Sequence, residues 1–144
     1  MRKSILSFPE QFLFKPEIEN GGKLNLRKFS KFIVAGMGGS HLSGDLVRAW
    51  KPELDIAVHS DYGLPPMSAA GRWNTLVIIS SYSGNTEETI DAFKSALRRK
   101  MPVVAVATGG KLLEFAQEKH VPFIKLPNTG IQPRMATGLG FRAR

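Results

Sequence analysis

The chain has 144 residues, a length typical of one domain, of which 42% are hydrophobic and 22% charged, as in ordinary globular proteins. It contains no cysteine, which excludes disulfides and thiolate metal sites and fits a cytoplasmic protein, and no apolar stretch approaches the length of a membrane span. The formal charge of +8 attracts anions such as a phosphorylated metabolite or nucleic acid, but the basic residues lack interleaved aromatic residues, so we do not expect nucleic-acid binding.

Residues 1–30 are predicted to form an amino-terminal helical extension. We expect a short helix near 9–14 and then a polar turn at Gly21–Gly22. From residue 31 onward, short apolar runs alternate with loops rich in glycine, serine or threonine and with helical patterns. The strands predicted from these runs are 31–35, 55–59, 75–80, 103–107 and 122–126.

Apolar residues at helical spacing follow the first, third and fourth of these strands. The residues that define the three helices are Leu42, Leu46, Val47 and Trp50; Ile90, Phe93 and Leu97; and Leu112, Leu113 and Phe115. This alternation predicts an α/β fold over 31–144, a doubly wound parallel sheet of about five strands flanked by helices, of the flavodoxin-like kind. Gln132–Arg134 begins a last helical pattern, which Gly138 and Gly140 weaken.

The loop at 81–86 places three hydroxyl side chains and a glycine between a strand and a helix, the composition of an anion cradle. Gly84 allows a tight turn, so that backbone N–H groups point at one centre, and Asn85 tolerates unusual backbone angles. Ser83 and Thr86 can donate hydrogen bonds to phosphate oxygens. The alternative is a helix cap, because Thr86 followed by two glutamates is by itself a good helix start.

The loop at 36–40 invites comparison with a dinucleotide-binding fingerprint. His41 stands where the third glycine of that fingerprint would be needed, although Asp61 offers the acidic residue. The other interpretation is that Gly38 and Gly39 admit a sugar close to the backbone, with Ser40 as cap and hydroxyl donor. A nucleotide-binding P-loop at 109–111 lacks the hydroxyl residue that binds magnesium.

The three histidines, His41, His59 and His120, show no metal-ligand spacing with one another or with carboxylates, so no metal site is predicted. Arg134 differs from the other basic residues because it follows the last strand, and Pro133 stiffens the approach to it. An arginine there can face the same crevice as the loops and stabilise a developing oxyanion. The alternative is a surface arginine.

Together, four segments resemble the bifunctional phosphoglucose/phosphomannose isomerase family, which is built from sugar-isomerase (SIS) domains. They are 36–40, 81–89, 108–110 and 132–134. The Ser-Gly-Asn-Thr sequence at 83–86 is shared with many sugar-isomerase domains and indicates phosphosugar binding, whereas Gln-Pro-Arg at 132–134 narrows the match to this family. The resemblance extends from Phe8 to Phe141.

The resemblance implies that Ser81, Ser83 and Thr86 bind the substrate phosphate, with Ser40 and Gly39 nearby. It also implies that Arg134 steadies the enediolate formed as glucose 6-phosphate or mannose 6-phosphate is interconverted with fructose 6-phosphate. The resemblance implies dimers, and it implies no metal or other cofactor.

Family members carry two such domains, and their catalytic glutamate lies in the second, which this chain lacks. The chain therefore resembles the amino-terminal half, truncated before the catalytic base, and we expect it to bind sugar phosphate without appreciable isomerase activity of its own. A non-catalytic phosphosugar sensor is the alternative, and a nucleotide-binding domain is disfavoured by His41. Arg134 favours the isomerase, because a pure sensor does not need an enediolate stabiliser.

Overall fold

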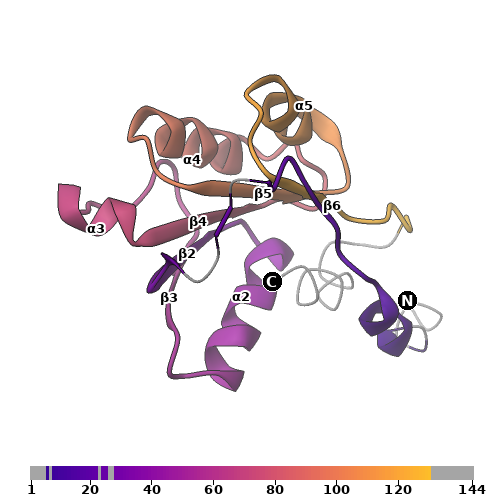
Figure 1. Cartoon of the computed structure of the whole chain (residues 1–144). Coiled ribbons are helices and arrows are strands. Elements are labelled where there is room, and N and C mark those ends of the chain that lie inside the picture. The colour runs from indigo at the N-terminus through magenta and orange to yellow at the C-terminus, as the bar shows by residue number, and fades with distance from the viewer. Residues whose placement is uncertain (1–5, 7, 23, 26–27, 131–144) are drawn as a thin grey trace.

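Six strands form one sheet in the order β1-β6-β5-β4-β2-β3, with helices on both faces (Figure 1). The computed structural model describes residues 6, 8–22, 24, 25 and 28–130. The strands are Ile18–Glu19 (β1), Lys31–Ala35 (β2), Asp55–His59 (β3), Thr75–Ser80 (β4), Val103–Ala107 (β5) and Phe123–Lys125 (β6). The helices are the 3-10 helix Phe8–Leu13 (η1) and the α-helices Gly39–Trp50 (α2), Ala69–Trp73 (α3), Glu87–Arg98 (α4) and Gly110–Glu118 (α5).

The five strands predicted from apolar runs are confirmed, and they pair in parallel. Lys31, which begins β2, lies opposite both Asp55 of β3 and Thr75 of β4, so β2 is flanked in register by its two neighbours. Every residue of β5 is buried, as expected for a parallel strand covered on both faces. The order of these five strands is that of a flavodoxin-like sheet, so the α/β doubly wound class is confirmed.

The described part of the first thirty residues contributes to this same sheet. The predicted short helix is present as η1, and β1 adds a sixth strand that the sequence analysis did not predict. Ile18 and Glu19 lie opposite Ile124 and Phe123, so β1 runs antiparallel to β6 and occupies the edge beyond it. The domain boundary at residue 30 stays a prediction.

The helices divide between the two faces of the sheet. Figure 1 shows α4 and α5 on one face and α2 on the other. Right-handed connections explain the division, because the chain moves outward from β2 to β3 in one direction and from β4 through β5 to β6 in the other. The larger core lies under α4 and α5, where Phe93 and Leu112 are fully buried against Val77, Ile79 and Ala105.

Helix α2 packs with a different face from the one its sequence indicates. Leu42, Leu46 and Trp50 are exposed, with Trp50 at 67%. Gly44 instead faces the sheet, where a Cβ on it would lie 2.9 Å from the Cγ1 of Val34. The absence of a side chain at Gly44 lets the helix approach β2 closely, and this approach decides which face is buried.

None of the helices in the described part of the chain is long and apolar enough to cross a membrane. The last predicted helical pattern, together with Gln132, Pro133 and Arg134, lies outside the described residues.

Replacing Gly44 with alanine is expected to destabilise the fold, although alanine favours helices over glycine. The added methyl group meets the stiff, branched Val34 side chain, and such overpacking costs about 1–2 kcal/mol. The control is Ala49→Gly at an exposed position of the same helix. This substitution is expected to lower the free energy of unfolding by about 1 kcal/mol through helix propensity alone. Urea unfolding measures both, and a Gly44→Ala chain more stable than wild type would contradict the packing described.

Candidate functional site

We use the word crevice for the switch point of the sheet, which lies at the carboxyl ends of β2 and β4 between the loops that follow these strands. The two strands are adjacent and parallel, and the helices that follow them leave to opposite faces of the sheet. This is the point in a doubly wound sheet where ligands bind, because the loops on either side separate. The loop at 36–38 follows β2, and the loop at 81–86 follows β4.

The two loops are joined by a hydrogen bond from the Tyr82 backbone N–H to Ser40 Oγ, at 3.1 Å. Gly36 lies close to the neighbouring strand, and a Cβ on it would come within 2.8 Å of the Ser80 carbonyl oxygen. Gly38 has a positive φ of 54° immediately before α2, and a Cβ there would meet nothing within 4 Å. The backbone at Gly38 is therefore open to the approach of a ligand.

The Ser81 hydroxyl is buried and used within its own loop. Ser81 Oγ lies 3.0 Å from Thr86 Oγ1 and accepts a hydrogen bond from the Gly84 N–H at 3.1 Å. Thr86 occupies the cap position of α4, yet its side chain makes no capping hydrogen bond. The hydroxyls of Ser81 and Thr86 thus close the loop upon itself rather than capping the helix.

Two residues of the loop face solvent. Ser83 and Asn85 are exposed, and Ser83 Oγ accepts a hydrogen bond from the Asn85 N–H at 3.2 Å. The N–H groups of Glu87 and Glu88, in the first turn of α4, donate to no acceptor among the described residues. A hydroxyl and unpaired helical N–H groups together favour an anion at this end of a twelve-residue helix.

A third loop, at 108–110, holds the 81–86 loop in place from the other side. Thr108 Oγ1 donates to the Tyr82 carbonyl oxygen at 2.7 Å, and the Leu112 N–H donates to the Gly84 carbonyl oxygen at 2.9 Å. Gly84 has a φ of 75°, and a Cβ on it would collide with the Gly109 carbonyl oxygen. The 81–86 loop is therefore fixed in shape before any ligand arrives.

Acidic side chains gather on the side of the crevice next to β3. A shallow hollow there is lined by Gly36, His59, Asp61 and Glu88, among others. The negative charge of Glu88, with smaller contributions from burial and from Glu87 and Asp91, raises the pKa of the exposed Tyr62 phenol. The sequence analysis named Asp61 and the two glutamates after Thr86, but it gave no sign that Asp61 and Glu88 line the same hollow, because they come from different loops.

His41 forms a separate polar cluster on α2. Its Nδ1 lies 2.8 Å from Asp45 Oδ2, and Arg48 Nη2 donates to Asp45 Oδ1 at 3.2 Å. Among the described residues, no group of three or more histidine and carboxylate side chains is arranged to hold a metal ion.

The structure brings most of the predicted site residues together. The glycines at 38 and 39 and Ser40 border the same crevice as Ser81, Ser83, Gly84, Asn85 and Thr86. Arg134, the predicted oxyanion stabiliser, lies outside the described residues, so its position relative to the crevice stays a prediction.

Comparison with known proteins finds relatives in sequence and in fold. No family model matches the chain. A bifunctional phosphoglucose/phosphomannose isomerase from Caldicellulosiruptor bescii is 38% identical over 98% of this chain, and six further curated relatives carry the same name. The chain spans about two fifths of the length of the first of these relatives, 42% in the C. bescii protein, so it corresponds to only part of such an enzyme.

Two solved structures share the fold. The Vibrio vulnificus NanR protein complexed with ManNAc-6P superposes with a TM-score of 0.60 and 20% identity over 99% of this chain and 51% of that chain. The sugar isomerase domain of an RpiR transcription factor from Sphaerobacter thermophilus gives a TM-score of 0.57 and 17% identity over 97% of this chain and 84% of that chain. The chain therefore shares its fold with these two proteins.

Replacing Gly84 with alanine is expected to lower the free energy of unfolding by at least about 2 kcal/mol, since it adds both a disfavoured φ and a collision with Gly109. Gly109→Ala is the matched control, because its φ of 168° is extended and a Cβ on it meets nothing within 4 Å. Thermal unfolding of the two variants distinguishes these effects. Equal losses for both would show that the two loops do not pack as described.

Proposed function

We propose that this chain, which is related in sequence to one part of the bifunctional phosphoglucose/phosphomannose isomerases, binds the phosphate of a hexose 6-phosphate between its 36–40 and 81–86 loops. The observation that carries the proposal is the 81–86 loop, fixed by Ser40 on one side and by Thr108 on the other. Because this loop is already ordered, little conformational entropy is lost when an anion binds.

In this proposal, some residues of the loop contact the phosphate and others hold the loop in shape. Ser83 and the N–H groups of Glu87 and Glu88 contact the phosphate oxygens, and Thr86 turns its hydroxyl from Ser81 toward the ligand. Ser81 holds the loop closed, while Gly84 and Asn85 give it its shape. The sugar lies over Gly38, which is exposed and where a Cβ would meet nothing within 4 Å, next to Gly39 and Ser40.

Catalysis in this proposal needs a general base in addition to Arg134. Arg134 stabilises the enediolate, but an arginine stays protonated at working pH and cannot remove the carbon-bound proton. The base comes from the portion of the isomerase that lies beyond the matched two fifths. Glucose, mannose and fructose 6-phosphates are the proposed ligands, and a homodimer and a cytoplasmic location belong to the same proposal.

A non-catalytic phosphosugar sensor is the second candidate. It is favoured by the structural likeness to the sugar isomerase domain of a transcription factor. The two functions share the phosphate-binding loop and differ in what surrounds the sugar carbons. If Arg134→Ala weakens sugar-phosphate binding but does not lower the isomerase rate once a base is supplied, the sensor is favoured.

Ser83→Ala and Thr86→Ala are each expected to weaken the binding of fructose 6-phosphate. A hydrogen bond to a charged group contributes about 1.5–3 kcal/mol, which corresponds to a loss of affinity of at least about tenfold. Isothermal titration calorimetry measures the change. The control is Ser30→Ala, an exposed serine before β2 at the opposite edge of the sheet.

If both loop variants bind fructose 6-phosphate as tightly as the Ser30→Ala control, the two hydroxyls serve only the structure of the loop. If the wild-type chain is folded and shows no binding at several millimolar sugar phosphate, the proposed function itself is wrong.

The chain alone is expected to show no isomerase turnover above background with glucose 6-phosphate. A positioned base is worth about 10²–10⁴-fold, and in this proposal neither Asp61 nor Glu88, which line the neighbouring hollow, serves as that base. A coupled assay for fructose 6-phosphate checks this, with Thr86→Ala as the background control. Turnover well above that control, lost in Glu88→Gln or Asp61→Asn, would place the base within this chain.

A further inference from the structure

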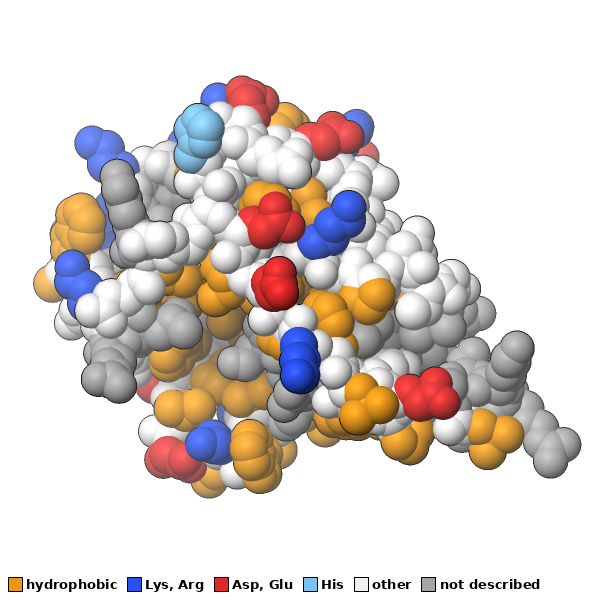
Figure 2. All heavy atoms as spheres, turned by 45° about the vertical axis from the view of Figure 1, so that its right-hand side comes forward, with side chains coloured by type: hydrophobic (Ala, Val, Ile, Leu, Met, Phe, Trp, Pro, Cys, Tyr) orange, Lys and Arg blue, Asp and Glu red, His pale blue; other side chains and the backbone are white. Residues whose placement is uncertain are grey.

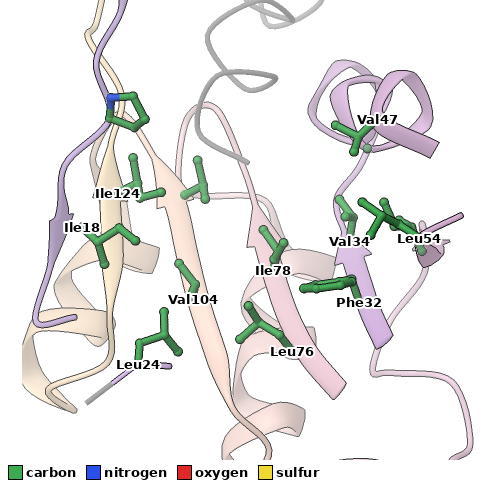
Figure 3. A pocket seen from close by; sticks show the side chains of 14 residues that line it. Ile18, Leu24, Phe32, Val34, Val47, Leu54, Leu76, Ile78, Val104 and Ile124 are labelled. Atoms are coloured by element: carbon green, nitrogen blue, oxygen red, sulfur yellow. The ribbon is translucent and has the colours of Figure 1, made fainter. Parts of the chain in front are cut away.

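The positive charge of the chain is not gathered into one patch on the face that Figure 2 shows. Lysine and arginine side chains lie apart from one another there, among acidic and apolar side chains, although the formal charge is +8. The apolar groove of about 360 Å³ on the α2 face offers an anion nothing, because none of the described residues that line it is charged; Figure 3 shows Phe32, Val47 and Leu76 among them. The charge that a bound phosphate meets therefore depends on single side chains close to the 81–86 loop.

The 81–86 loop itself supplies no positive charge. It offers hydroxyl and N–H groups, and the two residues that follow it, Glu87 and Glu88, are acidic. A phosphate monoester carries a charge of about −1.5 to −2 at pH 7. The dipole of α4 attracts this charge, whereas the two carboxylates in the first turn repel it. A cation beside the loop would therefore contribute binding energy that the loop does not provide.

Lys111 is tied to this loop through its backbone. The Lys111 N–H donates to Asn85 Oδ1 at 3.1 Å, and the Asn85 N–H donates to Ser83 Oγ at 3.2 Å. The preceding residue, Gly110, approaches the loop so closely that a Cβ on it would lie 2.6 Å from the Ser83 carbonyl oxygen. Two hydrogen bonds thus connect Lys111 to the hydroxyl that binds phosphate in the proposed function.

Lys111 lies in the first turn of α5, and its side chain is exposed. Because α5 follows β5, its N-terminus lies at the carboxyl edge of the sheet, where the 81–86 loop also lies. Helical side chains lean toward the N-terminus of their helix, so the Lys111 side chain leans toward this edge. Its flexible four-carbon stem lets the ammonium reach an anion beside Ser83. None of the ion pairs among the described residues occupies this ammonium.

We propose that the Lys111 ammonium binds the phosphate group beside Ser83, an inference that rests on the proposed function. The Gly-Gly-Lys sequence at 109–111, which is no nucleotide-binding P-loop, then has a use of its own. Its glycines let the backbone approach the 81–86 loop, and its lysine adds the charge that this loop lacks. A sugar without a phosphate gains nothing from Lys111, so this residue makes the site selective for phosphorylated sugars.

Lys111→Gln tests the charge alone, because glutamine keeps the backbone N–H that holds Asn85. In calorimetry at about 0.1 M salt, this variant is expected to bind fructose 6-phosphate about tenfold more weakly than the wild-type chain, whereas Lys111→Arg keeps most of the affinity. The matched control is Lys119→Gln, just beyond the other end of α5, where the Lys119 ammonium lies 2.9 Å from a carboxylate oxygen of Glu118. It changes the net charge equally and is expected to alter the affinity by no more than about twofold.

At about 1 M salt, the difference between the two glutamine variants is expected to shrink to about twofold, because the Debye length falls to about 3 Å. Equal affinities of these variants at the lower salt concentration would overturn the proposal. So would an undiminished loss for Lys111→Gln at the higher one, since its cause would then be packing rather than charge. If the folded wild-type chain does not bind fructose 6-phosphate at all, the proposed function is wrong and this inference fails with it.

Discussion

The backbone contact between Gly84 and the turn at Gly109–Gly110 is the constraint on which the site depends. It allows the Leu112 N–H to reach the Gly84 carbonyl oxygen, and the Lys111 N–H to reach Asn85 Oδ1 at 3.1 Å. A side chain at Gly84 would separate the loops that follow β4 and β5. The 81–86 loop, which Ser40 holds through the Tyr82 N–H, would then lose its support on the other side, and the crevice would lose its shape.

The sheet could be predicted from the sequence because its central strands are continuous apolar runs rich in β-branched residues. Two features of the fold could not be predicted from the sequence. β1 has only two residues, so no alternation marks it, and it exists because Ile18 pairs with Ile124. The face that α2 buries could not be predicted either. Helical periodicity is judged from apolar side chains such as Leu46 and Trp50, and it does not show that Gly44 permits a close approach to Val34.

That the predicted loops lie together at one edge of the sheet could be expected from the sequence, but the hydrogen bonds within them could not. Ser81 and Ser83 have the same side chain, yet one hydroxyl is buried within the loop and the other is exposed. Composition cannot distinguish them, since the difference comes from the turn at Gly84. The acidic hollow could not be predicted either. Asp61 follows β3 and Glu88 begins α4, and only the fold makes both of them line the same hollow. The sequence comparison agrees with the resemblance to phosphosugar isomerases, whereas the role of the loops stays a prediction.

The central claim is that the phosphate of a hexose phosphate binds at the first turn of α4. Titrating a ¹⁵N-labelled chain with fructose 6-phosphate, and following the amide resonances by NMR, tests it most directly. The account predicts saturable shifts that are largest for the amides of Ser83, Glu87 and Glu88, which have no acceptor among the described residues. Shifts confined to the basic residues Arg98, Arg99 and Lys100, at the far end of the same helix, would contradict it.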